Sequence, residues 1–282
     1  MPFISRQGIR IRYEVEGNGP PLVLHHGFSS NLEVWLAAGY VRALKTDYQL
    51  ILIDARGHGG SDKPHGPDAY RVEQFAGDVV GLLDELGIPK AHYWGYSMGA
   101  VIGFEIARCA PSRFRSLTLG GHTPYGPRTD AEKQFVKLFV DNVAVALEKG
   151  MEAYIGFLEA ASGPIPPIAR KRLLENDPRA LSAMTRAFHE WQGIADILAK
   201  IEVPCLIYAG EADPLYPGAS EGASHIPAAR FISLPGLDHF GALFASDLVL
   251  PHVKWFLAEV GAAEAENRRQ EPKGVDGNHE HG

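Results

Sequence analysis

Ser97 is the side chain whose setting most clearly suits chemistry. It lies in the pattern Gly-x-Ser-x-Gly, formed by Gly95, Ser97 and Gly99. A run typical of a β-strand precedes it, and residues 98–109 are compatible with a helix. A serine at such a strand-to-helix turn sits on a tight, strained bend that exposes its hydroxyl. That hydroxyl can attack a carbonyl carbon once a base removes its proton.

The residues around the serine fit the same interpretation. Side chains at Gly95 and Gly99 would collide across so sharp a turn. Met98 begins the helix, so its backbone N–H lies at a helix N-terminus, where a developing negative charge is stabilised. The pattern alone is weak, because it arises by chance in roughly one chain in ten of this size, and a glycine-rich loop is the alternative. A base, an acid and a second backbone donor must therefore be found elsewhere in the chain.

Composition and charge exclude several classes of protein. The chain has 282 residues, of which 45% are hydrophobic and 22% charged, and its formal net charge is −7. We expect no nucleic-acid partner, because Arg170-Lys171-Arg172 is the only dense basic run and suits a solvated helix face. We expect no membrane association, because no run approaches the ~18 apolar residues of a membrane span. The N-terminus lacks a signal-peptide pattern, so a cytoplasmic enzyme is expected.

The sequence predicts no cofactor and no metal ion. It has no His-x-x-x-His spacing, and its two cysteines, Cys109 and Cys205, lie far apart. Both cysteines have apolar neighbours, so we expect buried free thiols. The run Gly57-His58-Gly59-Gly60 lacks the Gly-Lys-Ser/Thr ending of a phosphate-binding loop, which argues against a nucleotide site.

Alternating strand and helix patterns must position the candidate residues. Strands are predicted before Ser97 and at residues 3–6, 8–15, 22–25, 49–54, 116–119, 205–209 and 230–234. Helices are predicted at residues 32–44, 70–86, 98–109 and 243–260. Between about 125 and 200 the β-alternation stops, and four helices are predicted at residues 132–147, 151–159, 168–175 and 180–191.

This order is typical of an α/β protein with a doubly wound, mostly parallel sheet and a helical cap insertion. We divide the chain into a first core part (residues 1–124), a helical cap (125–200), a second core part (201–261) and a tail (262–282) expected to be disordered. In such sheets ligands bind beyond the carboxyl ends of the strands. The candidate residues that come just after strands are Phe28, Arg56, Ser97, His122 and Asp213.

From about residue 3 to residue 260 the chain resembles an α/β-hydrolase. Motifs of that superfamily match in order: His26-Gly27, Asp54-x-Arg56-Gly57-His58-Gly59-x-Ser61, Gly95-x-Ser97-x-Gly99, and Gly210-x-x-Asp213-Pro214 with Asp238-His239-Phe240. The chain order Ser, Asp, His is the one that this fold uses. The resemblance implies a serine hydrolase of the esterase or lactonase type with a Ser-His-Asp triad.

The resemblance assigns His239 as the base, within about 2.6–3.2 Å of the Ser97 hydroxyl. Asp213 would hold the imidazole in the right tautomer and stabilise the imidazolium. Glu211 is a rival for that role, whereas Asp238 is expected to shape its loop. The backbone N–H groups of Phe28 and Met98 would meet the oxyanion.

Other polar residues of these motifs are expected to be structural. His26 would brace the loop before Phe28, and His25 would point into the fold. For Asp54, Arg56 and His58 we expect a turn pinned by an Asp–Arg contact.

Residues near the cap are expected to contact the substrate. His122, Tyr125 and Trp191 are the candidates for its pocket. The cap also supplies aromatic residues, most of which would fill its own core: Phe135, Phe139, Tyr154, Phe157, Phe188 and Trp191.

The expected substrate is a small-molecule carboxylic ester of small to medium acyl chain. The alternative is a lactonase acting on an acyl-homoserine lactone or an enol-lactone, since the triad chemistry is the same. C–C bond hydrolases, amidases and perhydrolases share the pattern, whereas dehalogenases and epoxide hydrolases place an aspartate where this chain has Ser97. A hydrolase-like ligand receptor without turnover is the alternative of another class. Fold does not set the physiological substrate, and the sequence leaves the oligomeric state open.

Overall fold

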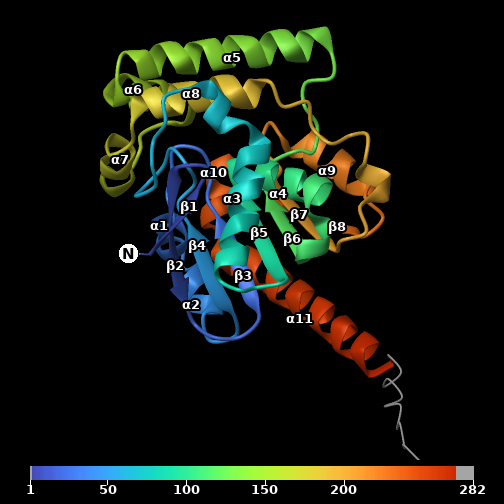
Figure 1. Ribbon diagram of the computed structural model, residues 1–282. Coiled ribbons are helices and arrows are strands. Elements are labelled where there is room, and N and C mark those ends of the chain that lie inside the picture. Colours follow the sequence, from blue (N-terminus) through green and yellow to red (C-terminus); the bar gives the residue numbers. More distant parts are fainter. Residues whose placement is uncertain (1, 271–282) are drawn as a thin grey trace, which may run out of the picture.

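The computed structural model describes residues 2–270, except the side chains of residues 131, 132, 135, 161, 162 and 268. Its centre is an eight-stranded sheet with the strand order β1-β2-β4-β3-β5-β6-β7-β8 (Figure 1). The strands are β1 (Phe3–Arg6), β2 (Ile9–Glu16), β3 (Pro21–His25), β4 (Gln49–Ile53), β5 (Ala91–Tyr96), β6 (Phe114–Gly120), β7 (Cys205–Gly210) and β8 (Ala229–Leu234). β2 pairs antiparallel with β1 and β4, and all other pairs are parallel. The predicted mostly parallel sheet is confirmed.

Helices cover both faces of the sheet because its inner strands alternate side chains between two apolar cores. In β3, Leu22 and Leu24 enter one core and Val23 enters the other. One core packs against α3 (Val72–Glu85), α4 (Met98–Cys109) and α9 (Tyr216–Ser224). The opposite core packs against α1 (Glu33–Ala37), α2 (Tyr40–Leu44), α10 (His239–Phe244) and α11 (Ser246–Gln270). Short 3-10 turns complete the core at η1 (Pro67–Tyr70), η2 (Pro111–Arg113) and η3 (Leu198–Lys200).

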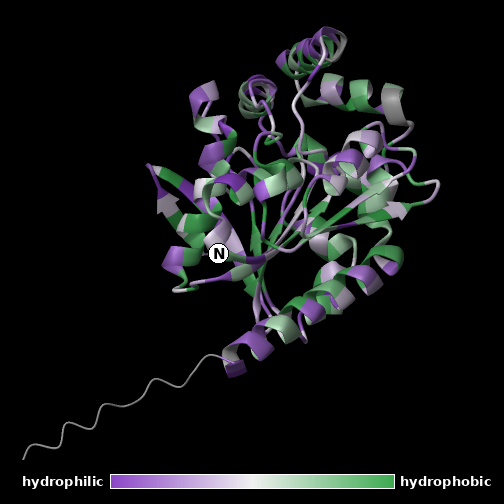
Figure 2. Ribbon diagram, turned by 90° about the vertical axis from the view of Figure 1, so that its right-hand side faces the viewer, coloured by the Kyte–Doolittle hydropathy of each residue, from purple (hydrophilic) through white to green (hydrophobic). Residues whose placement is uncertain are grey.

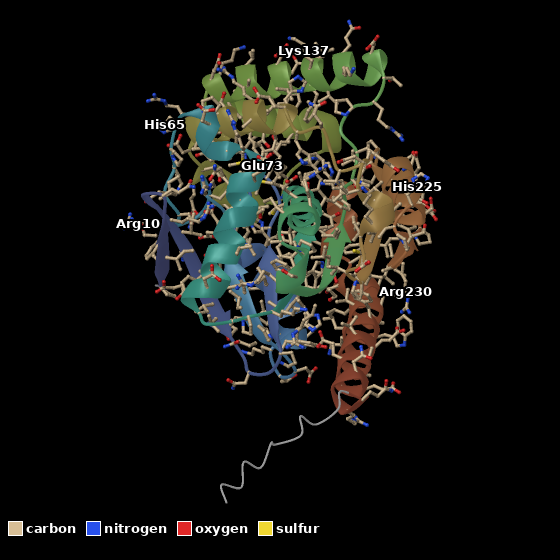
Figure 3. All side chains as sticks on the ribbon, turned by 45° about the vertical axis from the view of Figure 1, so that its right-hand side comes forward. Arg10, His65, Glu73, Lys137, His225 and Arg230 are labelled. Atoms are coloured by element: carbon tan, nitrogen blue, oxygen red, sulfur yellow. The ribbon has the colours of Figure 1, made fainter. Side chains whose placement is uncertain are left out.

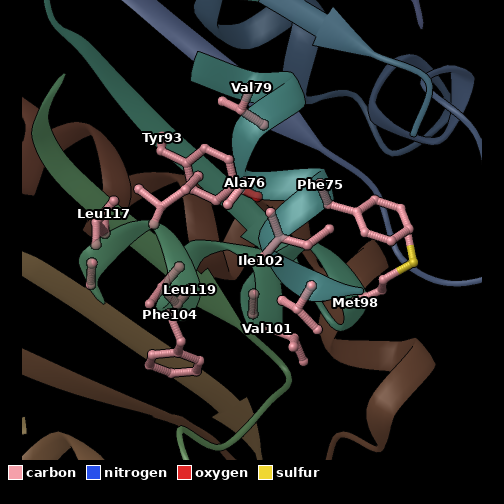
Figure 4. Packing of buried hydrophobic residues seen from close by; sticks show 14 of the residues in the cluster. Phe75, Ala76, Val79, Tyr93, Met98, Val101, Ile102, Phe104, Leu117 and Leu119 are labelled. Carbon is pink, nitrogen blue, oxygen red and sulfur yellow. The ribbon is translucent and has the colours of Figure 1, made fainter. Parts of the chain in front are cut away.

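The helix that carries the turn after β5 is fixed by close packing. Figure 4 shows Val101 and Ile102 of α4 among side chains from the neighbouring helix and strands, including Phe75 of α3 and Leu119 of β6. All four side chains are buried. Burial of this kind stabilises the fold by roughly 1.5–3 kcal/mol for each large apolar side chain. The N-terminus of α4 is therefore held rigidly beside the end of β5.

Four further helices between β6 and β7 form the helical insertion. They are α5 (Asp130–Glu148), α6 (Met151–Ser162), α7 (Pro167–Leu174) and α8 (Pro178–His189), and they lie across one end of the sheet in Figure 1. A small apolar cluster of their own includes Leu147, Tyr154 and Leu181, and Phe28 of the core packs against it. The two ends of the insertion meet in a β-bridge between Tyr125 and Gly193. Since Phe28 follows β3, the insertion lies over the carboxyl end of the sheet.

Polar and charged side chains lie toward the outside. In Figure 2 the strands are mostly green and the outer helices carry much of the purple. Figure 3 shows charged side chains such as Lys137 on α5 and Arg230 on β8 at the periphery. Within residues 2–270, no helix combines the length and the apolar character needed to cross a membrane.

Three sequence expectations need correction. The helix predicted at residues 32–44 is two short helices, because Gly39 adopts a φ of 84° between them. The tail was expected to be disordered from residue 262, but α11 continues to Gln270, and residues 271–282 lie outside the described part of the chain. Cys205 is buried as expected, whereas Cys109, at the last turn of α4, is exposed.

Candidate active site

Ser97 occupies the tight turn between β5 and α4. Its φ is 53°, a left-handed value that is strained for a residue with a Cβ atom. A Cβ atom at Gly99 would lie 2.2 Å from the carbonyl oxygen of His25, and one at Gly95 would lie 2.1 Å from the carbonyl oxygen of Gly99. Both glycines are therefore required for the turn, as the sequence predicts. The turn leaves the Ser97 side chain partly exposed at the carboxyl end of the sheet.

A chain of two hydrogen bonds links Ser97 to the loops after the last two strands. His239 Nε2 lies 3.0 Å from Ser97 Oγ, and His239 Nδ1 lies 2.6 Å from Asp213 Oδ2. Asp213 cannot donate when ionised, so Nδ1 carries the imidazole proton and Nε2 accepts from the serine hydroxyl. The imidazole thus has the tautomer that a general base requires.

The surroundings of Asp213 distinguish it from the two neighbouring acids. Its side chain is 1% exposed, and its Oδ1 accepts the Leu215 N–H at 2.9 Å. Glu211, the rival acid, accepts a hydrogen bond from the Ser233 hydroxyl instead. Asp238 is the N-cap of α10 and accepts the Gly241 N–H, so it shapes the loop as expected. Of these three acids, only Asp213 contacts the imidazole of His239.

His239 is also held through its backbone by the residue before the serine. The Tyr96 hydroxyl donates to the carbonyl oxygen of His239 at 2.5 Å, and the two rings lie 5.5 Å apart. Burial raises the pKa of Tyr96 well above its usual range, so its hydroxyl stays protonated and remains a donor. This role could not be predicted from the sequence, because nothing near Tyr96 in the sequence indicates a partner 143 residues away.

Two backbone segments lie beside Ser97, the N-terminus of α4 and the loop at Gly27. Met98 is the first residue of α4, so its N–H has no acceptor within the helix. Gly27 brings the Phe28 loop close on the other side, because a Cβ atom at Gly27 would lie 3.3 Å from Ser97 Cβ. Phe28 itself is partly buried. The role of the Phe28 and Met98 N–H groups as donors to a negative charge that develops beside Ser97 stays a prediction.

Histidines support the Phe28 loop. His26 Nε2 accepts the Ala55 N–H at 3.0 Å, and its Nδ1 lies 2.7 Å from the carbonyl oxygen of Gly27. His58 Nε2 accepts the Ser29 N–H at 3.1 Å. His25 is buried, and burial lowers its pKa to about 3. All three rings thus belong to the scaffold beneath the loop.

The expected contact between Asp54 and Arg56 is wrong. Arg56 pairs with Asp78 of α3 through two bonds of 2.7 Å, whereas Asp54 pairs with Arg12 of β2 at 2.9 Å. Both aspartates are buried, and pairing each with a buried guanidinium avoids an isolated charge. The residues are structural, as predicted, but their partners come from distant elements.

The three residues predicted for the substrate pocket lie near the two ends of the insertion, and their side chains have different partners. Burial, assisted by His239, lowers the pKa of His122 to about 4. The Trp191 ring lies 6.3 Å from the His122 ring, and its Nε1–H donates to Glu105 at 3.2 Å. The Tyr125 hydroxyl instead contacts His225 at the C-terminal end of α9, at 2.7 Å. Their contact with a substrate stays a prediction.

The aromatic residues of the insertion divide into two groups. Tyr154 and Phe157 belong to the insertion's own cluster, whereas Phe188 packs on Phe75 of the core. Phe139 is exposed, although its ring contacts that of Phe157. The side chain of Phe135 lies outside the described residues. Tyr154 reaches the Phe28 loop, with ring centroids of Tyr154 and Phe28 6.3 Å apart.

No group of three or more His, Cys, Asp or Glu side chains that could hold a metal occurs among the described residues. Two surface hollows of about 440 Å³ lie along the insertion, one between η1, α5 and α8 and one beside the start of α5, and neither includes Ser97 or His239. The site is defined by its hydrogen-bonded residues.

Known proteins resemble this chain in sequence and in fold. Residues 20–148 match the model of a family described as having the alpha/beta hydrolase fold. A protein assigned as the carbamate hydrolase RutD of Azorhizobium caulinodans is 27% identical over 92% of this chain and 99% of its own length. 3-Oxoadipate enol-lactonase 2 of Acinetobacter baylyi is 26% identical over 75% of this chain and 79% of its own length.

A solved structure extends the likeness to three dimensions. The crystal structure of the enol-lactonase from Burkholderia xenovorans superposes with a TM-score of 0.76 at 25% identity, covering 91% of this chain and all of that one. The likeness therefore includes the insertion as well as the sheet. On the family match over residues 20–148, the strand order and this superposition, the chain has the α/β-hydrolase fold.

Proposed function

We propose that the protein is a serine hydrolase that cleaves a carboxylic ester of small to medium acyl chain through an acyl-serine intermediate. The observation that carries this proposal is the relay Ser97–His239–Asp213, with contacts of 3.0 and 2.6 Å. These residues come from three separate loops, and a purely structural role does not require a serine hydroxyl, an imidazole and a buried carboxylate in line. The chemistry that this order serves is nucleophilic acyl transfer.

In the first half-reaction, Ser97 Oγ attacks the ester carbonyl carbon while His239 Nε2 takes the hydroxyl proton. The carbonyl oxygen becomes an oxyanion that accepts hydrogen bonds from the N–H groups of Phe28 and Met98. Each such donor is worth about 3–4 kcal/mol of transition-state stabilisation. His239 then returns the proton to the leaving alkoxide, which departs as the alcohol. Asp213 stabilises the imidazolium between the two transfers.

In the second half-reaction, water replaces the alcohol. His239 removes a proton from the water, whose oxygen attacks the acyl-serine carbonyl carbon. The second tetrahedral intermediate collapses to the carboxylic acid, and the proton on His239 returns to Ser97 Oγ. The cycle consumes one ester and one water and needs no cofactor or metal ion.

The helical insertion serves as the cap of this site. We assign residues 1–124 and 201–261 to the catalytic core and 125–200 to the cap. Support comes from Phe28, which packs against the cap's apolar cluster, and from His122 and Trp191, which lie where the chain enters and leaves the insertion. Tyr125 is the third residue proposed to contact the substrate. The apolar side chains where the core meets the cap would bind the acyl chain of an ester.

Lactone hydrolysis is the second candidate. It is favoured by the sequence likeness to the Acinetobacter enol-lactonase and by the structural likeness to the Burkholderia enol-lactonase. A lactone differs from a linear ester only in that the leaving alcohol stays attached to the acyl group. The carbamate hydrolase relative makes a carbamate a useful third test compound.

Kinetics on matched compounds tests these proposals. Purified protein is assayed with p-nitrophenyl butyrate, with linear esters, with lactones of equal carbon number and with a carbamate. We expect turnover of esters that is lost in Ser97→Ala and retained in Ser224→Ala, which removes an exposed serine on α9. A higher kcat/KM on lactones would favour the second candidate. Absence of turnover on every compound, with a ligand still bound, would support a non-catalytic receptor instead.

A further inference from the structure

We propose that His58 from the core and Asn176 from the insertion are positioning residues that together set the Phe28 N–H through Ser29. This proposal rests on the proposed function, because it assigns a task to the oxyanion hole. The proposal adds that the insertion, besides covering the oxyanion hole, helps to position the Phe28 N–H within it.

The backbone at Ser29 is strained and needs support. Its φ is 55°, and among the described residues only Gln7 and Ser97 share a positive φ without being glycine. Unlike Gln7, Ser29 is buried, with 8% of its surface exposed. A left-handed residue of this kind persists only where its surroundings determine it, and such residues cluster at functional sites. Ser29 follows directly after the proposed oxyanion donor.

The core holds the first two peptide groups. The carbonyl oxygen of Gly27 accepts the Nδ1–H of His26 at 2.7 Å, so the Phe28 N–H of the same trans peptide points the opposite way. The next peptide donates its Ser29 N–H to His58 Nε2 at 3.1 Å. His58 Nδ1 lies 3.2 Å from the carbonyl oxygen of Arg56, which fixes the proton on Nδ1 and leaves Nε2 as the acceptor.

The buried setting of His58 keeps that acceptor available. Its side chain is fully buried, with ring centroids 5.0 Å from His26 and 6.0 Å from Phe28. Burial and the neighbouring His26 lower the pKa of His58 well below its usual value. The ring is therefore neutral at neutral pH and can accept the Ser29 N–H.

The insertion holds the third peptide group and the Ser29 side chain. Asn176, in the turn after α7, donates through Nδ2 to the carbonyl oxygen of Ser29 at 3.0 Å. The same Nδ2 contacts the carbonyl oxygens of Arg172 and Leu173, which anchors the amide to the C-terminal end of α7. The Tyr154 hydroxyl lies 3.3 Å from Ser29 Oγ. Every polar group of Ser29 thus has a partner, and two of the three partners belong to the insertion.

These contacts imply that the insertion must be seated for the oxyanion hole to be complete. Releasing the Ser29 carbonyl or N–H lets the strained residue relax, and the Phe28 N–H turns with it. A displacement of about 1 Å at a catalytic group costs up to about a hundredfold in rate. The loss falls on the transition state, because the oxyanion exists only there.

Two pairs of matched variants test this role. His58→Gln keeps an acceptor at the position of Nε2, whereas His58→Asn keeps only a donor at the position of Nδ1. Asn176→Asp keeps the size of the side chain but removes its donors, and Asn31→Asp makes the same change at a neighbouring position where the side chain acts as an acceptor. Each variant is assayed for kcat and KM with p-nitrophenyl butyrate and for the inhibition constant of phenylboronic acid, which forms a tetrahedral adduct with the active serine.

We expect His58→Asn and Asn176→Asp to lower kcat by about tenfold to a hundredfold and to weaken boronate inhibition by a similar factor, with KM changed by less than about threefold. His58→Gln and Asn31→Asp should stay within about threefold of the unaltered protein in all three quantities. Thermal unfolding of each variant identifies any that fail to fold. If His58→Asn does not fold, Asn176→Asp decides the matter alone.

Two results would overturn the proposal. One is that folded Asn176→Asp and His58→Asn keep the kcat and boronate affinity of the unaltered protein. The other is that His58→Gln falls as far as His58→Asn, since the acceptor would then be irrelevant. If the unaltered protein shows neither turnover nor boronate binding, the proposed function fails and this proposal falls with it. Retained activity in the variants would remove this proposal alone.

Discussion

The α/β core and the helical insertion contribute to the site through different kinds of structure. In the core, each residue of the proposed triad lies within five residues of the end of a strand, and Asp213 is almost completely buried. Ser97 is held in a strained turn by contacts that exclude any larger residue at Gly99. In the insertion, large apolar side chains reach solvent: Leu138 is 60% exposed and Ile168 is 72% exposed.

This difference indicates a division of labour. The residues of the proposed triad belong to core segments whose backbone conformation is tightly fixed. The insertion has a small apolar cluster of its own. It meets the core through apolar side chains of α8, such as Met184, and through hydrogen bonds such as Asn176 to Ser29 and His65 to Asp177. Changes in the core should therefore alter rate or folding sharply, whereas changes on the outside of the insertion should be tolerated.

The largest effect is expected from the acid of the relay. Asp213→Asn removes the charge that stabilises the imidazolium and favours the wrong tautomer, so kcat should fall by about 10³–10⁴-fold. Asp238→Asn is the matched control, because asparagine caps a helix as well as aspartate does, and its kcat should stay within about threefold. Steady-state kinetics on p-nitrophenyl butyrate measures both. Equal losses in the two variants would argue against Asp213 as the partner of His239.

The next largest effect is on stability and compares a glycine of the core with a glycine of the insertion. Gly99→Ala forces a Cβ atom to within 2.2 Å of the His25 carbonyl oxygen, so the free energy of unfolding should fall by about 3 kcal/mol or more. Gly156→Ala, on an exposed position of α6 with no neighbour within 4 Å, should raise it by about 0.5–1 kcal/mol. Urea denaturation distinguishes the two. A stable Gly99→Ala variant would show that the turn is looser than described.

A smaller effect concerns pH and tests how firmly the core excludes water. Burial, assisted by Arg115, lowers the pKa of His92 on β5 to about 4, whereas an unfolded histidine titrates near 6.5. Between those values the unfolded chain binds a proton that the folded chain does not. The free energy of unfolding should therefore fall with falling pH by about 1.4 kcal/mol per unit for this group.

His92→Gln tests that slope. The free energy of unfolding of the unaltered protein should fall between pH 6.5 and pH 4. His25 and His122 add to the effect of His92, because their pKa values are also lowered in the folded chain. The free energy of unfolding of the variant should fall less over this pH range, by about the contribution of one histidine. This difference does not depend on how stable the variant is at neutral pH. Urea midpoints at several pH values provide the comparison, and identical slopes would contradict burial of a neutral His92.

The smallest effect is expected on the outside of the insertion. Leu138→Gln on α5 changes a side chain that is already mostly exposed, so the free energy of unfolding should change by no more than about 0.5 kcal/mol. Thermal unfolding checks this. A loss of several kcal/mol would show that this face is covered in solution, for instance by another copy of the chain.

Much of the core could be predicted from local sequence patterns. The turn at Ser97 has glycines at fixed spacing and a strand and a helix on either side, so both its position and its strain were predictable. Helix α9 was not predicted, because its sequence is rich in glycine and serine and lacks helical periodicity. His239 was identifiable only through the family resemblance, since a single histidine after a strand carries no local pattern that indicates its partner.

The contacts that could not be predicted join residues far apart in the chain. Asp54 pairs with Arg12 and not with the nearby Arg56, because β2 and β4 are neighbours in the sheet. The contact between Asn176 and Ser29 spans 147 residues and depends on how the insertion lies over the core. Composition and periodicity describe individual elements, whereas such contacts depend on how the elements pack.

The central claim is that Ser97 becomes a nucleophile because His239 removes its proton. The most direct measurement is covalent labelling with diethyl p-nitrophenyl phosphate, followed by mass spectrometry of the intact protein and its peptides. The account predicts one diethylphosphoryl group on Ser97, none on Ser97→Ala, and much slower labelling of His239→Gln. A protein that hydrolyses esters while Ser97 stays unlabelled, or that is labelled equally fast without His239, would contradict it.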